Sequence, residues 1–234
     1  MRDSIQGKKL NGTLDYLNVV GSEGFSLKQL HPGNFRQNFT NVTYLENMFK
    51  YRAIKRVLEV AEDFNEEISE GAQFQDAWNS LANDFISATN AQCYYFIIKN
   101  FILKVNEVKD PKIHNVLTSL VVLFALSNFF DDNWGDIIDN ENFRDIKKQV
   151  KKCLNTLRPN LVGLDDSFDY PDKALRSTIG RYDGNVYEAL FEAAKNSSLN
   201  QIEPFDGYKE FLQPHLDLEL LKRGNKPIQS LGKF

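Results

Sequence analysis

The three histidines are the residues most suited to proton transfer or metal binding, and they are widely spaced in this 234-residue sequence. His31, His114 and His215 lie far apart in the sequence, and none has a second histidine at metal-ligand spacing on one helix face. We therefore expect no metal site and interpret all three as surface histidines.

An acidic stretch between residues 131 and 141 has the composition of a calcium-binding loop but not its register. With Asp131 as the first position, Gly135 falls one position too early, and Asn142 stands where the final glutamate is needed. We expect this stretch to form the polar connection between two helices.

Sequence motifs for nucleophilic catalysis or phosphate binding are absent. The chain contains no GxSxG, GxGxxG or GxxxxGK pattern. Cys93 and Cys153 lack the spacing of a zinc site, and we expect both to be buried, reduced thiols. The residues themselves therefore assign no catalytic residue and no metal ligand, and they leave any cofactor-binding residue unknown.

The overall charge argues against nucleic acid as a partner. The formal net charge is −4 and the isoelectric point is about 5.5, whereas nucleic-acid-binding domains are usually strongly basic. A basic run, Lys147, Lys148, Lys151 and Lys152, shares one helix face. This run is either a solvated helix face or a surface that contacts an anionic group, which a nucleotide or a neighbouring subunit would supply. The longest apolar run, residues 120–126, is too short to span a membrane.

Apolar residues recur at helical spacing along most of the chain, which predicts an all-α protein. Four long helices are expected, and short helices follow them. Thr43 and Gly71 mark the ends of the first helix, Pro159 ends the fourth, and the third is apolar on every side at its centre, as in a helix enclosed by others. No alternating strand pattern occurs. The expected long helices are 43–70, 74–108, 112–130 and 142–157, and the short ones are 172–179, 185–195 and 205–221.

These elements predict an antiparallel helical bundle with a helical tail. Residues 1–42 are interpreted as an irregular leading segment that continues from a missing upstream domain. Residues 43–213 form the helical-bundle domain, and residues 214–234 form the tail.

Residues 180–188 contain a charged pair at a turn between two predicted helices. Gly180 ends one helix, and Asn185 with Glu188 approximates a capping box for the next. Arg181 and Asp183 lie between them, where a guanidinium can form a bidentate pair with a carboxylate. We interpret the segment as a structural turn that this pair stabilises.

This turn also carries a family resemblance. Gly180–Ser198, GRYDGNVYEALFEAAKNSS, resembles the end of peroxisomal acyl-CoA oxidases, in which a GRYDGNVYE stretch introduces one of the last helices. The resemblance extends from Lys9 to about Tyr208. Its further segments are Lys9–Asn18, Tyr51–Ala61, Ala77–Asn79, Ala88–Tyr95 and Leu161–Phe168.

The resemblance implies a function for the longer protein. Acyl-CoA oxidases are FAD-dependent dimers that convert fatty acyl-CoA and O2 to trans-2-enoyl-CoA and H2O2 in the first step of peroxisomal β-oxidation. The catalytic glutamate and most FAD-binding regions of the family precede the part matched here. The chain is thus expected to be the C-terminal helical domain, covering the flavin and acyl site and supporting the dimer. Alone, it is expected to be inactive and to bind no FAD.

An alternative interpretation is a non-catalytic helical module that forms a heterodimer with a full-length oxidase. Both interpretations use the same apolar faces. The family implies a peroxisomal location, although the final residues Gly232, Lys233 and Phe234 depart from the Ser-Lys-Leu import signal.

Overall fold

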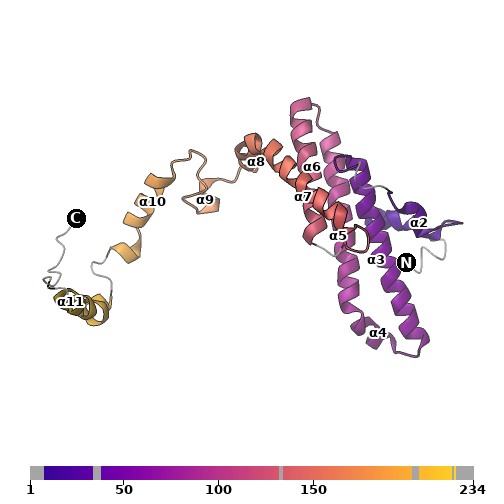
Figure 1. Ribbon diagram of the computed structural model, residues 1–234, viewed down its shortest axis with the longest axis horizontal. Helices are drawn as coiled ribbons and strands as arrows, with labels where there is room; N and C mark the ends of the chain where they lie inside the picture. The colour runs from indigo at the N-terminus through magenta and orange to yellow at the C-terminus, as the bar shows by residue number, and fades with distance from the viewer. Residues whose placement is uncertain (1–7, 34–37, 132–133, 202–205, 223, 225–234) are drawn as a thin grey trace. The chain divides into compact units, whose positions relative to one another are not determined.

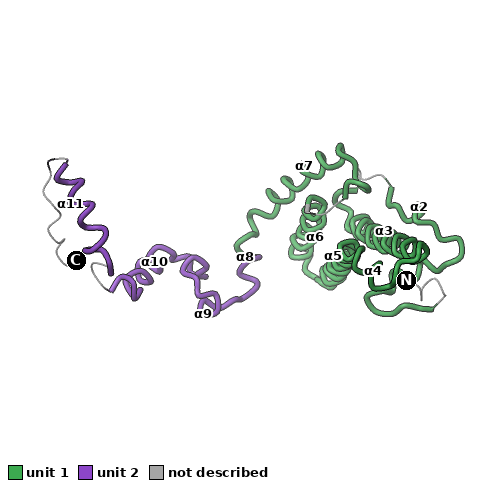
Figure 2. Tube along the Cα trace, turned by 90° about the horizontal axis from the view of Figure 1, so that it is seen from below, with its two compact units in different colours: residues 1–162 green, residues 163–234 purple. Residues whose placement is uncertain are grey.

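A computed structural model describes residues 8–33, 38–131, 134–201, 206–222 and 224. These residues form helices of α, 3-10 and π type and no strand, which confirms the all-α prediction. The chain divides into two compact units, unit 1 (residues 1–162) and unit 2 (residues 163–234; Figure 2). The boundary between the units, at residues 162 and 163, differs from the predicted bundle domain, which extends to residue 213.

The first long helix, α3, spans Val42–Ser69. Asn41, and not the expected Thr43, caps its start, because the Asn41 side chain accepts a hydrogen bond from the Tyr44 backbone N–H at 3.1 Å. The helix ends beside Gly71, whose φ of +100° suits a residue without a Cβ. Gly71 therefore acts as the stop signal that the sequence predicts.

The predicted helix 74–108 is two helices, α4 (Phe74–Ser80) and α5 (Ala82–Asn106). They meet at Leu81, whose backbone leaves the helical region with ψ of 15°. The Ser80 hydroxyl bonds the Glu67 carboxylate at 2.6 and 2.7 Å, which fastens α4 to the end of α3. The helical pattern predicted over 74–108 is therefore present but broken at Leu81.

The remaining long helices of unit 1 are α6 (Pro111–Asp131) and α7 (Asn140–Leu157), and a short helix, α8 (Leu161–Asp166), begins in unit 1 and ends in unit 2. Asp110 and Asp139 accept backbone hydrogen bonds at the starts of α6 and α7. Helix α7 ends at Leu157, two residues before Pro159, as the sequence predicts, and a 3-10 turn, Arg158–Asn160, leads from it into α8.

The core of unit 1 lies between α3, α5, α6 and α7 (Figure 1). The leading segment contributes to it. Tyr16 and Leu17 of a 3-10 helix, η1 (Gly12–Gly21), are buried, and the Tyr16 ring meets Tyr95 of α5 edge to face at 5.1 Å. A short helix, α2 (Leu27–Leu30), packs beside α3.

An aromatic cluster joins α3, α6 and the connection to α7. The Phe49 ring lies 5.5 Å from Phe129 and 5.1 Å from Trp134, and Phe129 lies 4.6 Å from Trp134. The Arg52 guanidinium stands 4.7 Å from the centre of the Trp134 ring. We call Phe49, Arg52, Phe129 and Trp134 the Trp134 cluster.

Helix α6 is less enclosed than its composition predicts. Leu126 and Phe129 are buried, but Leu123 is only partly buried and Ile113 is exposed. By length and composition α6 could cross a membrane, with a hydropathy of 1.7 over residues 111–130. Core helices of soluble proteins pass the same test, and α6 packs against α3, α5 and α7.

Unit 2 has short elements and no buried residue in its described part. The predicted helix 172–179 is only one turn, because Arg176 adopts a left-handed φ of 48°. The last predicted helix, 205–221, is a π-helical turn followed by α11. The elements are α9 (Asp172–Leu175), α10 (Val186–Lys195), η3 (Ser198–Asn200), η4 (Tyr208–Leu212) and α11 (Gln213–Lys222).

Replacing Leu126 by alanine should destabilise unit 1 strongly. Leu126 is 0% exposed, so the substitution leaves a cavity that costs about 2–5 kcal/mol. Urea denaturation followed by circular dichroism measures the change. The matched control is Leu154→Ala, at a leucine that is 51% exposed, which should cost less than about 1 kcal/mol. Equal losses for the two variants would contradict this packing.

Candidate functional sites

The acidic connection between α6 and α7 has a structural role in the described residues. Asp136 forms ion pairs with Lys55 and with Arg56, whose Nη2 lies 2.9 Å from the carboxylate. Burial alone would raise the pKa of Asp136, but these two cations lower it below its usual range. Within the described part of the chain, no group of three His, Cys, Asp or Glu residues could hold a metal ion.

The histidines lie on separate elements. His31 follows α2 and meets the Tyr51 ring edge to face at 5.1 Å, whereas His215 lies on α11. Both are exposed, but His114 of α6 is partly buried, with its Nδ1 3.5 Å from the Thr118 hydroxyl. The surface interpretation therefore holds for two of the three.

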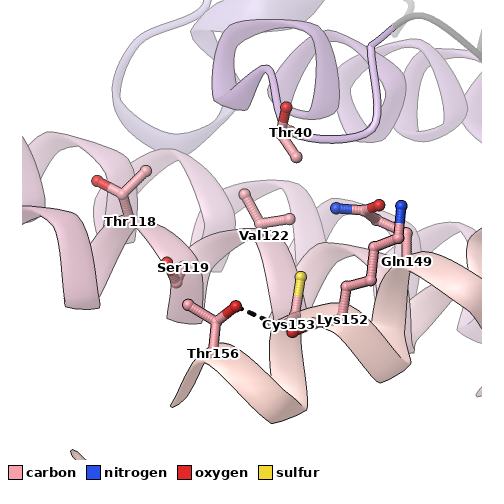
Figure 3. A pocket seen from close by; sticks show the side chains of 8 residues that line it. All are labelled: Thr40, Thr118, Ser119, Val122, Gln149, Lys152, Cys153 and Thr156. Carbon is pink, nitrogen blue, oxygen red and sulfur yellow. Dashed lines mark hydrogen bonds between the residues drawn. The ribbon is translucent and has the colours of Figure 1, made fainter.

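A small cavity of about 210 Å³ lies between α6, α7 and Thr40 (Figure 3). Its hydroxyls are largely used within the helices, since Thr118, Ser119 and Thr156 each donate to a backbone carbonyl four residues earlier. The remaining lining residues are Val122, Gln149, Lys152 and Cys153. The cavity is polar but contains no nucleophile paired with a base.

The cysteines differ from each other. Cys153 is buried in α7, where burial raises the pKa of its thiol and keeps it protonated. Cys93 is exposed on α5, so the expectation of two buried thiols was wrong for it. The prediction failed because apolar residues flank Cys93 in the sequence of α5, whereas its own side chain lies on the exposed face of that helix.

The basic run of α7 lies on an exposed face, as one interpretation of the sequence proposed. All four lysines are exposed. Lys148 pairs with Asp145 at 2.9 Å, and Lys147 lies 5.9 Å from the Phe130 ring. Ile146, directly before Lys147 in sequence, is buried.

A second, much larger concavity of about 1,280 Å³ lies along α3, α4 and α5. Aromatic side chains line it, namely Phe64, Phe74, Trp78 and Phe85. We call it the α3–α5 groove. Sequence periodicity places these residues on helices but gives no sign that a groove separates them.

The turn before α10 is organised by Arg181 and Asp183. The Arg181 Nε and Nη2 donate to the two carboxylate oxygens at 3.0 and 2.5 Å, as the sequence predicts. Asp183 also accepts from the Asn185 backbone N–H at 2.9 Å, and Gly184 has a φ of +69°. The expected capping box does not form, because the Asn185 side chain makes no capping bond.

This pair changes the acidity of Asp183. The hydrogen bonds from Arg181 lower the pKa of Asp183 to about 2, and the Asn185 N–H adds to the effect. The neighbouring Tyr182 and Tyr187 are 81% and 84% exposed. The turn therefore presents two aromatic rings that the described residues of unit 2 leave exposed.

Comparison with known proteins covers nearly the whole chain. The acyl-CoA oxidase family model matches residues 41–217. Peroxisomal acyl-coenzyme A oxidase 1 of Cavia porcellus is 34% identical over 217 residues, which are 91% of this chain and 33% of that protein. The Homo sapiens enzyme of the same name is 34% identical over 207 residues, covering 87% of this chain and 31% of that protein.

Solved structures give the same result. Arabidopsis thaliana acyl-CoA oxidase 1 matches with a TM-score of 0.76 and 28% identity, over 94% of this chain and 33% of that one. Caenorhabditis elegans acyl-CoA oxidase-1, complexed with FAD and ATP, matches with a TM-score of 0.77 and 26% identity, over 93% and 32%. This chain spans about a third of the length of these relatives.

Arg181→Ala should raise the pKa of Asp183 toward its ordinary value of ~3.9, because the largest stabilising contact is lost. Carboxyl-detected NMR titration measures this. The folded pKa lies below the unfolded one, so the pair favours the turn above about pH 4, and that contribution disappears toward pH 2. Arg181→Lys is the control and should retain part of the shift. An unchanged pKa in Arg181→Ala would show that the pair is not formed.

A thiol reagent such as Ellman's reagent should react with Cys93 at least about tenfold faster than with Cys153, because only Cys93 is exposed. Cys93→Ser should leave only the slow phase, and Cys153→Ser only the fast one. Two equally fast thiols in the native chain would contradict the placement of Cys153.

Proposed function

This chain belongs to the acyl-CoA oxidase family, and from that premise we propose that it is the C-terminal helical part of an FAD-dependent oxidase. The complete enzyme would convert fatty acyl-CoA and O2 to trans-2-enoyl-CoA and H2O2. The observation that carries the proposal is the family match across both units, from residue 41 to residue 217. The peroxisomal names of the relatives support the same location for this protein. Its final residues, 225–234, lie outside the described part.

The described residues do not fit FAD by themselves. The small cavity, at about 210 Å³, is below the roughly 300–1,000 Å³ of typical ligand pockets. The α3–α5 groove is large enough but apolar, and its one lining cation, Lys55, is paired with Asp136 and Glu59. A pyrophosphate needs free cations or helix N-termini. We infer that the flavin site depends on the part of the enzyme that precedes this chain.

The two units would then contribute differently. Unit 1 has its own buried core and can serve as a rigid support. Unit 2 has none among its described residues, and it exposes large apolar side chains that are costly to leave in water. We propose that unit 2 packs on the upstream part of the enzyme, covers the flavin and acyl site, and supports the dimer. Tyr182, Tyr187 and Phe191 of the α10 region are the side chains we assign to that contact.

The alternative is a non-catalytic module that forms a heterodimer with a full-length oxidase. The exposed side chains of unit 2 serve this role equally well. The two proposals differ in one requirement, because an oxidase part must complete an enzyme that lacks this region, whereas a module binds an enzyme that already has it.

The purified chain should be colourless and should produce no H2O2 from palmitoyl-CoA. When it is mixed with the Cavia porcellus enzyme truncated before its matching region, flavin retention and H2O2 formation should return. A Tyr187→Ser variant should reduce this recovery, and Tyr170→Ser, also an exposed tyrosine of unit 2 but outside α10, is the control.

A yellow chain that oxidises palmitoyl-CoA alone would overturn the proposal. Failure to restore the truncated enzyme, together with co-elution with the full-length enzyme, would favour the heterodimer. Light scattering on each mixture gives the stoichiometry.

A further inference from the structure

The distribution of charge along the chain is strongly uneven. Residues 57–98 contain eight of the 32 carboxylates and none of the 28 lysines and arginines, and no histidine. This stretch forms the second half of α3, all of α4 and the first two-thirds of α5. The helices that meet where α4 joins α3 to α5 (Figure 1) therefore contribute only negative charges over residues 57–98.

The residues lining the α3–α5 groove belong to this acidic stretch, apart from Leu27 and Lys55. Its aromatic floor is continuous, since Phe64 lies 5.3 Å from Phe74, Phe74 lies 6.1 Å from Trp78, and Trp78 stacks on Phe85 at 4.2 Å. Phe74 is nevertheless 62% exposed. Such a large exposed apolar surface is characteristic of a binding surface.

Helix α4, which carries Phe74 and Trp78 of the groove, is anchored to the rest of unit 1. Ala77 of α4 is fully buried, and the bonds between Ser80 and Glu67 fix α4 against α3. The groove is therefore preformed, and an occupant would not need to order α4 on binding.

The charged residues at the edge of the groove favour a positively charged ligand. Glu59 and Glu62 line the groove, and Glu66 lies one helical turn beyond Glu62 on α3. Lys55, the one cation among the lining residues, is neutralised by Asp136 and Glu59. Ligands that carry phosphate or carboxylate groups would be repelled, and so would a second copy presenting the same acidic face.

We propose that the α3–α5 groove binds a cationic amphipathic helix of another polypeptide. The apolar face of that helix would lie on Phe64, Phe74, Trp78 and Phe85, and its lysines or arginines would face Glu62 and Glu66, because Glu59 is already paired with Lys55 and Arg56. This is the helix-in-groove mode of recognition, with apolar anchors at helical spacing. The inference uses only unit 1, and it requires that the upstream part of the proposed oxidase leave the groove open.

The test uses the full chain and two synthetic helical peptides of about 18 residues, long enough for five turns. Both have the same leucine face, but one has lysines and the other glutamates on its polar face. Fluorescence anisotropy should show that the lysine peptide binds at least about tenfold more tightly, and that added salt weakens it.

Two pairs of variants test the site itself. Phe74→Ala should weaken the lysine peptide at least about tenfold, whereas Phe96→Ala, an exposed phenylalanine of α5 outside the groove, should not. Glu62→Lys with Glu66→Lys should reverse the preference toward the glutamate peptide. Glu107→Lys with Glu188→Lys adds the same charge elsewhere and should leave the preference intact. Circular dichroism verifies that each variant is folded.

Three results would overturn the proposal. The first is equal binding of the two peptides, or equal effects of Phe74→Ala and Phe96→Ala. The second is a dimer by light scattering that Phe74→Ala dissociates, since a second copy would then cover the groove. The third is loss of peptide binding when the truncated upstream enzyme is added, because the groove would then be filled within the oxidase.

Discussion

The packing of Trp134 against α3 is the contact on which the arrangement of unit 1 depends. The Trp134 ring contacts Phe49 and Arg52, which lie one turn apart on α3, and it also contacts Phe129 of α6. Two residues later, Asp136 pairs with Lys55 and Arg56 on the next turn of α3. The connection between α6 and α7 is thus fixed by adjacent turns of one helix, and this sets where α7 begins.

The consequence is a division of roles along the chain. Apolar side chains of α3, α5, α6 and α7 pack against one another, so unit 1 contains a buried core of its own. Unit 2 follows with exposed aromatic rings and no buried residue in its described part. A segment of this kind gains stability only from a surface outside itself, which is the physical reason for regarding the chain as one portion of a longer enzyme.

The sequence predicted helices and helix ends that depend on residues close together in the chain. Periodicity gave α3, α6 and α7, and Gly71 marked a true helix end. The break at Leu81 has no glycine or proline to mark it, and the neighbouring bond between Ser80 and Glu67 joins residues 13 apart, which local periodicity does not reveal. Arg176 shortened α9 through a left-handed conformation for which its residue type gives no warning.

The site was predictable only in part. The Arg181–Asp183 pair could be foreseen, because a guanidinium and a carboxylate two residues apart at a turn are within reach of each other. That Asp183, and not Asn185, bonds the backbone there depends on the turn's own geometry. The α3–α5 groove was invisible in the sequence, since aromatic residues at helical spacing are most often core residues.

Hydrogen exchange on the full chain, with and without the truncated upstream oxidase, tests the central claim most directly. Alone, the amides of α3, α5 and α6 should exchange slowly and those of α10 and α11 rapidly, because only unit 1 has a core. Adding the upstream part should protect α10. Protection of α10 in the isolated chain, or no change on addition, would contradict the account of this chain as part of a larger oxidase.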